Sequence, residues 1–252
     1  MHYLIEKSLA TLRAQGPLGL VSKTARFLLL AAELQVAGFA LRRKARDVGT
    51  PEEALDFSRR FRFGGVSIEP LQLGFEILQL LHLLERDPPR AVVEIGTSLG
   101  GSFFLFTRVA APDATLISVD LPGGTYGGGY FATRGRLLRS FARARQRVEL
   151  VRADSHDPKT LERTKRLLAG RAVDFLFVDG DHTYEGVRSD YEMYGALVRP
   201  GGLIAFHDIV PTTLEDVGVP AFWSELRVAH DTEEFRKPDR DAGKGIGLLR
   251  VR

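Results

Sequence analysis

Short apolar runs alternate with longer segments of helical periodicity along most of the chain. The helical segments include Phe75–Leu84 and Tyr184–Leu197, in which apolar residues recur at spacings of three and four. Each apolar run is followed at once by Glu, Asp or His, as expected of parallel strands that are buried on both faces. The alternation predicts an α/β, Rossmann-like fold with a mostly parallel sheet and helices on both of its faces. The runs are Ala91–Val93, Thr115–Val119, Val148–Ala153, Val173–Val178 and Leu203–Phe206.

The chain before these runs has a different character. Residues 1–65 are interpreted as a helical N-terminal arm, broken at Gly16-Pro17, and residues 66–252 as the domain that carries the strands. Phe27–Leu41 is the most apolar part of the arm, but it is too short to span a bilayer and contains Glu33. It also lacks the small-residue cleavage site of a secretory signal.

Charge separates the arm from the domain. Residues 1–65 hold 11 Lys and Arg against 6 Asp and Glu, a surplus of +5, whereas the net charge of the whole chain is +3. Two interpretations of the arm stay open. The helix packs on the domain or on another subunit, or it attaches to an anionic membrane surface through the basic residues behind it. These residues are Arg42, Arg43, Lys44 and Arg46.

Composition narrows the class of protein. The 252 residues are 44% hydrophobic and 27% charged, which is ordinary for a globular chain with a large core. Cysteine is absent, so disulfides and thiolate metal sites are excluded, and we expect a cytoplasmic protein that is peripheral to a membrane if the arm binds one.

The first strand leads into a glycine-rich turn with the sequence AVVEIGTSLGGS. Glu94 ends the apolar run, and Gly96, Gly100 and Gly101 precede an apolar segment that predicts a helix. Glycine lets a ligand approach the backbone, and a helix N-terminus offers unpaired N–H groups. The G-x-G-x-x-G pattern of dinucleotide sites is not met, because three non-glycine residues follow Gly96. A glycine turn without a ligand is the simpler alternative.

The next two strand ends extend this predicted site. Asp120 lies 24 residues after Gly96, where an acid can accept hydrogen bonds from both ribose hydroxyls of a nucleoside. The glycine-rich segment Leu121–Tyr130 is interpreted as a mobile cover over the cofactor, with a disordered connection as the alternative. Asp154 and Ser155 are placed to meet an adenine edge, although either of them, or Asp157, also suits a helix N-cap.

An arginine-rich segment follows the glycine-rich one. Its apolar residues predict a helix, and its basic residues are interpreted as a solvated face rather than a nucleic-acid site, because no aromatic residues interleave with them. The basic residues are Arg134, Arg136, Arg139, Arg143, Arg145 and Arg147.

The fourth and fifth strands end in the residues that suggest chemistry. Asp179 and His182 follow one strand, and His207 and Asp208 follow the other. Neighbouring carboxyl ends of a doubly wound sheet converge on one crevice, so we expect these four side chains to face each other. Two carboxylates and an imidazole suit an oxygen-preferring divalent cation, and His182 is a candidate general base. A structural histidine is the alternative for either imidazole taken alone.

Five segments together resemble a known family. EIGTSLGGS, SVDLPGG, ADSHDP, VDGDHTYEGVRSDY and RPGGLIAFHDI are similar to class I S-adenosylmethionine (SAM)-dependent methyltransferases. Within that class they resemble the metal-dependent O-methyltransferases of macrolide sugars and the family named after a cephalosporin hydroxylase component. The resemblance covers about residues 66–252 and implies a seven-stranded sheet that finishes with a reversed strand pair.

The resemblance also implies roles for individual residues. Asp179 and Asp208 would hold magnesium, or manganese, and His182 would take the proton. His207 stands where the family has an acid, so it is a candidate ligand that departs from the pattern. The residues assigned to the SAM site are Gln72, Glu94, Gly96, Thr97, Ser98, Ser102, Asp120, Asp154, Ser155 and Asp179.

The expected function is a metal-dependent O-methyltransferase that acts on a hydroxyl of a small molecule, such as a sugar or another vicinal diol of a natural product or glycolipid. A non-catalytic SAM-binding assembly subunit and a nicotinamide-dependent oxidoreductase are the alternatives. The expected partners are the hydroxyl substrate and a second copy of the chain, with peripheral membrane contact through the arm and no nucleic acid.

Overall fold

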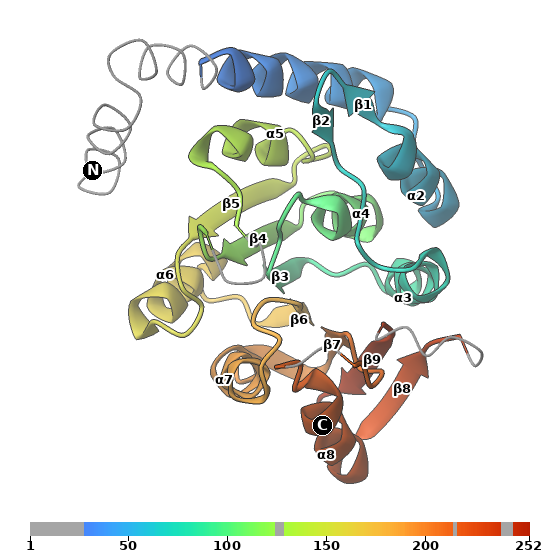
Figure 1. Cartoon of the computed structure of the whole chain (residues 1–252), viewed down its shortest axis with the longest axis vertical. Helices are drawn as coiled ribbons and strands as arrows, with labels where there is room; N and C mark the ends of the chain where they lie inside the picture. Colours follow the sequence, from blue (N-terminus) through green and yellow to red (C-terminus); the bar gives the residue numbers. More distant parts are fainter. Residues whose placement is uncertain (1–27, 124–128, 214–215, 238–243) are drawn as a thin grey trace.

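The computed structural model describes residues 28–123, 129–213, 216–237 and 244–252, and these residues form a seven-stranded sheet with helices on both faces (Figure 1). The strand order is β5-β4-β3-β6-β7-β9-β8; the first five are parallel and the last two run antiparallel to their neighbours. The predicted fold, with its reversed final pair, is confirmed. The strands are β3 Ala91–Ile95, β4 Thr115–Asp120, β5 Arg147–Arg152, β6 Val173–Val178, β7 Val198–His207, β8 Asp231–Phe235 and β9 Ile246–Arg250.

Helices occupy most of the remaining described chain. A helix over residues 28–44 comes first, and a small hairpin of β1 (Arg62–Phe63) and β2 (Val66–Ser67) lies between α2 and α3. A 3-10 turn, Ala132–Arg134, precedes α5. The helices are α2 Pro51–Arg60, α3 Gly74–Arg86, α4 Gly101–Val109, α5 Gly135–Arg139, α6 Pro158–Leu168, α7 Tyr184–Gly195 and α8 Val219–Ala229.

Strand β3, in the interior of the sheet, has a different layer of the core on each face. Its residues alternate: Val92 packs with the helix over 28–44 and with α2 to α5, whereas Val93 and Ile95 pack with α6, α7 and α8. All five residues of β3 are buried, which explains why the sequence shows a continuous apolar run rather than alternation. Each fully buried aliphatic side chain contributes about 1.5–3 kcal/mol relative to an exposed one.

The strand order also places the site. The chain leaves β3 for β4 on one side, and β6 joins β3 from the other side, so the strand order reverses between β3 and β6. Ligands of open α/β sheets bind at the carboxyl ends of strands at such a reversal. The residues after β3, β4, β6 and β7 are those from which the sequence predicts function.

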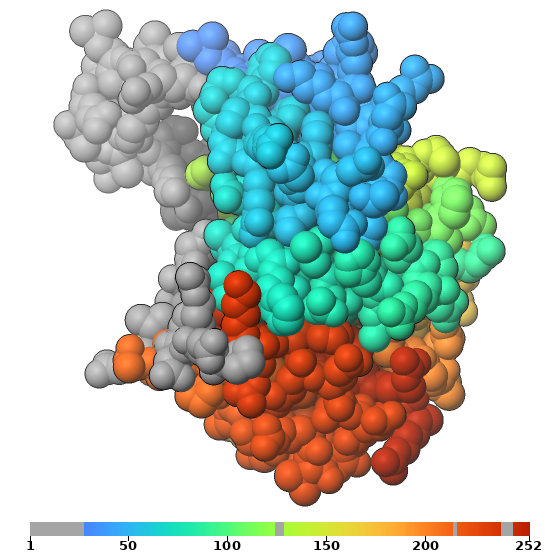
Figure 2. Space-filling model, turned by 90° about the vertical axis from the view of Figure 1, so that its right-hand side faces the viewer, coloured from blue at the N-terminus to red at the C-terminus, as the bar shows by residue number. Residues whose placement is uncertain are grey.

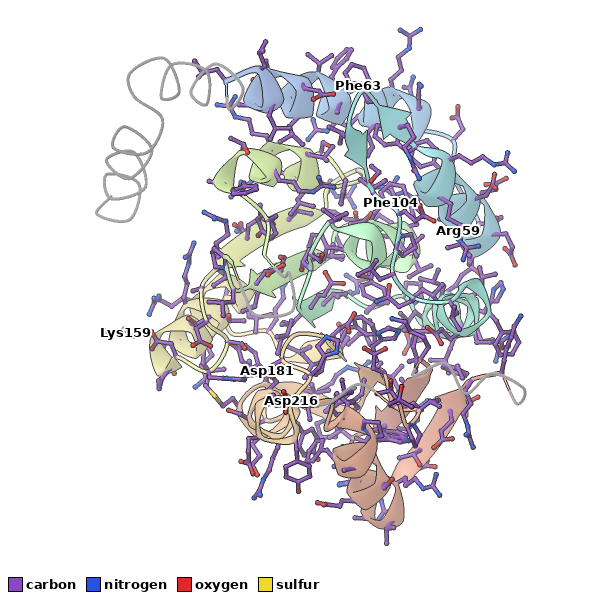
Figure 3. All side chains as sticks on the ribbon, viewed as in Figure 1. Arg59, Phe63, Phe104, Lys159, Asp181 and Asp216 are labelled. Atoms are coloured by element: carbon purple, nitrogen blue, oxygen red, sulfur yellow. The ribbon has the colours of Figure 1, made fainter. Side chains whose placement is uncertain are left out.

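The helices before the sheet are packed on it. Phe57 of α2 stacks on Phe104 of α4 with ring centroids 5.5 Å apart, and Arg108 donates to the carbonyl of Ala45 at 3.4 Å (Figure 3 labels Phe104). Seen from the side, these N-terminal segments cover the upper half of one face of the molecule (Figure 2). The part of the predicted arm that the structure describes thus shares the core of the domain; the predicted break at Gly16-Pro17 lies outside the described residues.

One face of the helix over residues 28–44 stays uncovered. Leu29, Val36 and Phe39 are exposed on it, and Phe39 is 73% exposed. Among the described residues, no helix combines the length and the apolarity needed to cross a bilayer. A second subunit or a membrane surface as the partner of this face stays a prediction.

The arginine-rich segment differs from the prediction. Helix α5 ends at Arg139. The chain after it passes the end of α4, where its side chains donate hydrogen bonds to the last carbonyls of that helix. Gln146 Nε2 donates to the carbonyl of Thr107 at 3.0 Å, and Arg143 Nη1 donates to that of Arg108 at 2.6 Å. Arg143 and Gln146 therefore supply partners to the last carbonyls of α4. The helix is shorter than predicted, but Arg136, Arg139, Arg145 and Arg147 are exposed as the solvated interpretation expects.

The end of α7 also lies earlier than predicted. The helix stops at Gly195, and Arg199-Pro200 already belong to β7. Pro200 is tolerated there because the pairing of β7 with β6 shifts register at this point, between Val173 and Phe175.

A partly buried ion pair holds α7 to the loop after β5. His156 Nε2 lies 3.2 Å from Oδ1 of Asp190, whose side chain is fully buried, without the alignment of a strong hydrogen bond. The interaction with Asp190 outweighs burial and raises the pKa of His156 to about 9, with a smaller contribution from Asp154. Burial raises the pKa of Asp190, although His156 opposes this.

This pair predicts a pH-dependent stability. Because the pKa of His156 is raised in the folded state, its contribution is complete below the unfolded value near 6.5 and is lost as the pH rises through about 9. We expect wild-type protein to lose about 1 kcal/mol more than His156→Gln between pH 6 and pH 9.5 in urea unfolding, since the partly exposed pair is screened. His82→Gln, which removes an exposed partner of Glu52, should follow wild type. Equal losses for wild type and His156→Gln would refute this assignment.

Candidate functional site

A buried carboxylate holds together the glycine-rich turn between β3 and α4. Glu94 lies within β3 rather than after it, and its side chain is fully buried. One of its oxygens accepts a hydrogen bond from Thr97 Oγ1 at 2.6 Å, and the other accepts one from Ser102 Oγ at 2.5 Å. Burial raises the pKa of Glu94 to about 8 against the opposing effect of these hydroxyls. Three of the residues assigned to the SAM site therefore form one network that shapes the turn.

Gly96 brings this turn against the end of β6. Its φ is +87°, and a Cβ on Gly96 would lie 1.9 Å from the carbonyl oxygen of Asp179. The N–H of Gly96 donates to the carbonyl of Val119 at 2.9 Å, and the N–H of Asp179 donates to that of Ile95 at 2.9 Å. The ends of β3, β4 and β6 are thus joined through the backbone, and only glycine fits at position 96.

Asp120 lies beside the same turn, at the end of β4. Its buried carboxylate accepts a hydrogen bond from the N–H of Ser98 at 2.6 Å, and Ser98 has a φ of +48°. Burial raises the pKa of Asp120 to about 6, although the N–H groups of Ser98 and Thr97 and the charge of Arg152 oppose the rise. The structure brings Asp120 and Ser98 together, and their contact with ribose stays a prediction. Residues 124–128 of the predicted cover lie outside the described residues.

Asp154 and Ser155 lie in the loop between β5 and α6 and make local contacts. Asp154 Oδ1 accepts a hydrogen bond from the N–H of His156 at 2.9 Å, and the carbonyl of Ser155 accepts one from the hydroxyl of Tyr194 at 3.1 Å. The N-cap of α6 is Asp157, one of the three residues considered for that role. Because Asp154 is not needed as a cap, its exposed carboxylate is available to a ligand.

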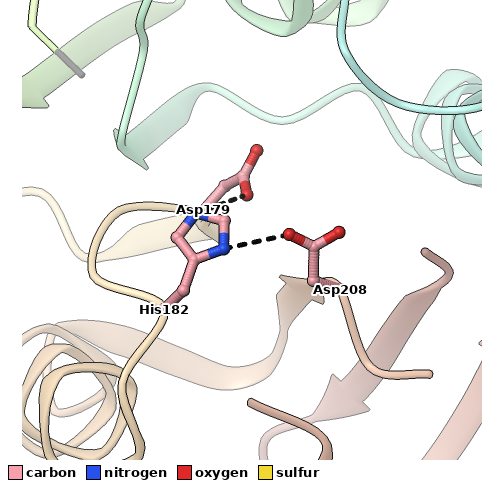
Figure 4. A group of neighbouring side chains, drawn as sticks. All are labelled: Asp179, His182 and Asp208. Atoms are coloured by element: carbon pink, nitrogen blue, oxygen red, sulfur yellow. Dashed lines mark ion pairs between the residues drawn. The ribbon is translucent and has the colours of Figure 1, made fainter. Parts of the chain in front are cut away.

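Three residues from the ends of β6 and β7 form the second corner of the site (Figure 4). His182 Nδ1 lies 3.0 Å from Asp208 Oδ2, and His182 Nε2 lies 3.9 Å from Asp179 Oδ1. One ligand atom from each of the three residues lies within 4.8 Å of the others. Asp208 follows β7 with a φ of +59°, a left-handed conformation that is unusual outside glycine. The structure thus brings together the strand-end residues that the sequence singled out.

The charges of this corner are complementary. Burial acts against protonation of His182, but its hydrogen bond to Asp208 and the charge of Asp179 outweigh burial and raise the pKa of His182. Burial alone would raise the pKa of Asp208, yet the hydrogen bond from His182 and the charges of His207 and Lys244 lower it. An imidazole with a carboxylate on one nitrogen is suited to accept a proton on the other.

His207 contacts three carboxylates. Its Nδ1 lies 3.1 Å from Asp179 Oδ1 and 3.2 Å from Asp208 Oδ1, and its Nε2 lies 3.1 Å from Glu76 Oε1. Burial disfavours its charge, but Asp179, Glu76 and Asp208 outweigh burial and raise the pKa of His207 to about 10. His207 Nδ1 therefore contacts both acids of this corner, and its Nε2 faces Glu76. The assignment of His207 as a metal ligand stays a prediction.

Gln72 also lies in this corner, where its contact with the cofactor stays a prediction, and Lys244 and Glu76 are two residues here that the sequence did not predict. Gln72, assigned to the cofactor, donates from Nε2 to Asp179 Oδ2 at 2.7 Å. Lys244 Nζ lies 3.5 Å from Asp208 Oδ1, and the sequence around Lys244 carried no signal for this role. Glu76 had a signal, because it lies on the same helical face as the buried Leu80 and Leu84, where a charge is out of place.

The corner has the donors of a divalent cation site. Two carboxylates and one imidazole are available. Asp208 Oδ1 is buried and accepts no well-aligned hydrogen bond from the described residues, because His207 Nδ1 and Lys244 Nζ contact it at 3.2 and 3.5 Å without the required alignment. Its lone pairs are therefore still open to a closer cation or donor. Carboxylate oxygens suit magnesium and manganese alike, whereas an imidazole favours manganese over magnesium. The residues present therefore fit a divalent cation.

Part of the chain is similar to a known protein family. Residues 93–209 match the family described as a methyltransferase domain. An uncharacterized protein of Sinorhizobium fredii, y4gI, is 31% identical over 173 residues, which make up 68% of this chain and 18% of that protein. An uncharacterized protein of Acanthamoeba polyphaga mimivirus, R132, is 32% identical over 137 residues, 54% of this chain and 59% of that protein. The chain thus spans less than two thirds of either relative.

Solved structures share the fold. An O-methyltransferase from Bacillus cereus in complex with S-adenosylhomocysteine (SAH) has a TM-score of 0.55 at 19% identity, over 84% of this chain and 97% of that one. CalS11, a TDP-rhamnose 3′-O-methyltransferase of calicheamicin biosynthesis, has a TM-score of 0.54 at 18% identity, over 87% and 93%. TomG from Streptomyces achromogenes, in complex with SAM, has a TM-score of 0.51 at 18% identity, over 80% and 89%. Residues 93–209 are thus similar to a methyltransferase-domain family, and the seven-stranded sheet with its antiparallel last strands has the fold of solved SAM-dependent methyltransferases.

Proposed function

We propose that this protein transfers the methyl group of SAM to a hydroxyl oxygen of a small polyhydroxylated acceptor. The observation that carries the proposal is the His182–Asp208 pair, 3.0 Å apart, beside the turn of the cofactor site. A neutral amine already has a free lone pair, whereas a hydroxyl needs help to lose its proton. A histidine oriented by a carboxylate supplies that help.

In the proposed reaction, His182 Nε2 accepts the hydroxyl proton, and Asp208 stabilises the imidazolium through Nδ1. The acceptor oxygen forms a bond to the methyl carbon as the bond from that carbon to sulfur breaks, which leaves SAH and a methyl ether. The buried Glu94–Thr97–Ser102 network and the Gly96 contact keep the two corners in a fixed relation. Orientation of the two reactants is the main contribution of the fold.

Asp179 and Asp208, with His182 in reach, would hold a divalent cation, which would lower the pKa of a hydroxyl bound to it. The imidazole cannot be both a ligand and the base. Because Nδ1 of His182 already faces Asp208, we assign the carboxylates to the cation and the imidazole to the proton. A base that works without a cation is the second candidate, and the distance of 3.0 Å favours it equally.

The acceptor class is proposed on two grounds. Two carboxylates on neighbouring strand ends suit an acceptor with adjacent oxygens, through a shared cation or through direct hydrogen bonds. One of the similar structures is a TDP-rhamnose 3′-O-methyltransferase by its description, which supports a sugar. A sugar moiety or another vicinal diol is therefore the class of acceptor to test first.

The turn between β3 and α4, together with Asp120, is called the cofactor corner, and its assignment to SAM can be tested. Asp120→Ala removes the carboxylate that holds the N–H of Ser98 and that we assign to the ribose, so SAM and SAH should bind at least 10-fold more weakly. Asp113→Ala, which removes an exposed partner of Arg90, is the control and should bind normally. Calorimetry with SAM, SAH and NAD tests this. Binding of NAD without binding of SAM would refute the cofactor assignment.

The second corner gives a prediction that separates base from cation. His182→Ala should lower turnover by roughly 100-fold to 10,000-fold, the loss typical of a general base, with SAM affinity unchanged. Chelation and Asp179→Ala should abolish turnover if a cation is required. The assay measures methyl transfer from labelled SAM to a panel of sugars and catechols, with magnesium, manganese or chelator.

The control for this experiment is His230→Ala, since His230 caps α8 away from the site. Full activity in chelator together with an inactive His182→Ala protein would establish the base without the cation. An active His182→Ala protein would contradict the assigned base.

A further inference from the structure

We propose that the start of helix α3 positions the carboxylate of Asp179, with Gln72 acting directly and Glu76 acting through His207. The second corner, formed by Asp179, His182 and Asp208, is called the acceptor corner from here on. This inference rests on the proposed function, because it gives these residues the task of orienting a group that binds a cation or the acceptor. None of them is a catalytic residue in the sense of touching the reacting atoms.

Both oxygens of Asp179 are held by protein groups. Gln72 Nε2 donates to Oδ2 at 2.7 Å, and His207 Nδ1 lies 3.1 Å from Oδ1. A carboxylate held at one oxygen can still rotate, whereas one held at both has its plane fixed. The free lone pairs of Asp179 then point in set directions toward the space shared with His182 and Asp208.

Glu76 fixes the imidazole ring of His207, which in turn contacts Oδ1 of Asp179. Its Oε1 accepts a hydrogen bond from the N–H of Leu73 at 2.7 Å and lies 3.1 Å from His207 Nε2. The side chains of Glu76 and His207 are each 2% exposed, so water offers the ring no alternative partner. The chain of contacts runs from the α3 backbone through Glu76 and His207 to Asp179, like the outer-shell partners that orient ligands in metal sites.

The burial of Glu76 argues against a role in helix capping alone. Helix α2 has the same cap in exposed form: Glu53 Oε2 accepts hydrogen bonds from the N–H groups of Gly49 and Thr50 at 2.9 and 3.2 Å. A cap therefore needs no buried carboxylate. Burying one is costly unless it is paired, and the partner of Glu76 is a histidine that reaches the acceptor corner.

The segment that leads into α3 packs closely against the turn between β3 and α4. A Cβ on Gly101, the first residue of α4, would lie 2.4 Å from the backbone of Pro70, two residues before Gln72. The segment that leads into α3 therefore lies on the start of α4, and its position is tied to the same turn that binds the cofactor. Gln72 and Glu76 reach the acceptor corner from this fixed base.

The experiment compares Glu76→Gln and Glu76→Ala with Glu53→Gln, which alters the matching cap of α2 far from the site. The readouts are Mn²⁺ affinity by calorimetry without SAM or acceptor, SAM affinity, and kcat and KM for the acceptor panel. Glu76→Ala should weaken Mn²⁺ binding by about 10-fold to 100-fold and lower kcat by a similar factor, the usual effect of losing an outer-shell partner. SAM affinity and KM should change less than about 2-fold.

Two comparisons separate positioning from simple stability. Glu76→Gln keeps an acceptor for His207 and Leu73, so it should recover part of the loss; it also keeps the test valid if the alanine variant fails to fold. In a His207→Asn background, which keeps the Asp179 carboxylate but removes the ring through which Glu76 acts, Glu76→Gln should have no further effect on Mn²⁺ binding or kcat. Equal effects of Glu76→Gln in both backgrounds, or a folded Glu76→Ala protein with wild-type Mn²⁺ affinity and kcat, would overturn the proposal.

Failure of the proposed function has a different signature. Wild-type protein that binds no Mn²⁺ and is fully active in chelator refutes the cation, and the kcat comparison then decides the positioning role alone. Wild-type protein that binds Mn²⁺ but methylates nothing in the panel refutes the proposed acceptor class, and Mn²⁺ affinity then decides it. In either case additive effects of the Glu76 and His207 substitutions overturn the inference.

Discussion

The close approach of two backbones, at Gly96 and Asp179, is the constraint on which the rest of the site depends. A side chain at position 96 would lie 1.9 Å from the carbonyl oxygen of Asp179, so the turn after β3 and the end of β6 touch without any spacer. In the proposed reaction the turn holds the cofactor and Asp179 faces the acceptor. Their contact would then set the relation between the methyl donor and the oxygen that receives the methyl group, which a reaction in line with the breaking bond requires.

Carboxylates crowd this edge of the sheet, and each is accommodated by different means. Glu94 is surrounded by hydroxyls and has a pKa near 8, so it is largely uncharged at neutral pH. Asp120 is held by backbone N–H groups, Asp179 by an amide and an imidazole, and Asp208 by an imidazole and the ammonium of Lys244. The edge therefore avoids the full repulsion of four negative charges, because Glu94 is largely neutral and each of the other three carboxylates contacts a hydrogen-bond donor or a cation.

Most of the fold and much of the site followed from the sequence, because both depend on local patterns. Apolar runs that end in acids identify parallel strands and place their ends at one edge, so the meeting of Asp179, His182 and Asp208 could be anticipated. What could not be anticipated depends on packing between distant segments. Glu76 and Lys244 reach the site from residues far from β6 and β7, and only the folded chain shows this. The short α5 has the same cause, since its arginine-rich continuation closes the end of another helix.

The shared core of the N-terminal helices and the sheet has a consequence for how the protein can be divided. Similarity to the methyltransferase family begins at residue 93, after helix α3 has ended. Grafting residues 93–209 onto another scaffold would carry across the glycine turn and the strand-end acids, but not the amide of Gln72 or the carboxylate of Glu76 that orient one of them. It would also remove Phe57, whose ring stacks on Phe104. The segment that is similar to the methyltransferase family is thus shorter than the segment whose side chains contact one another in the acceptor corner.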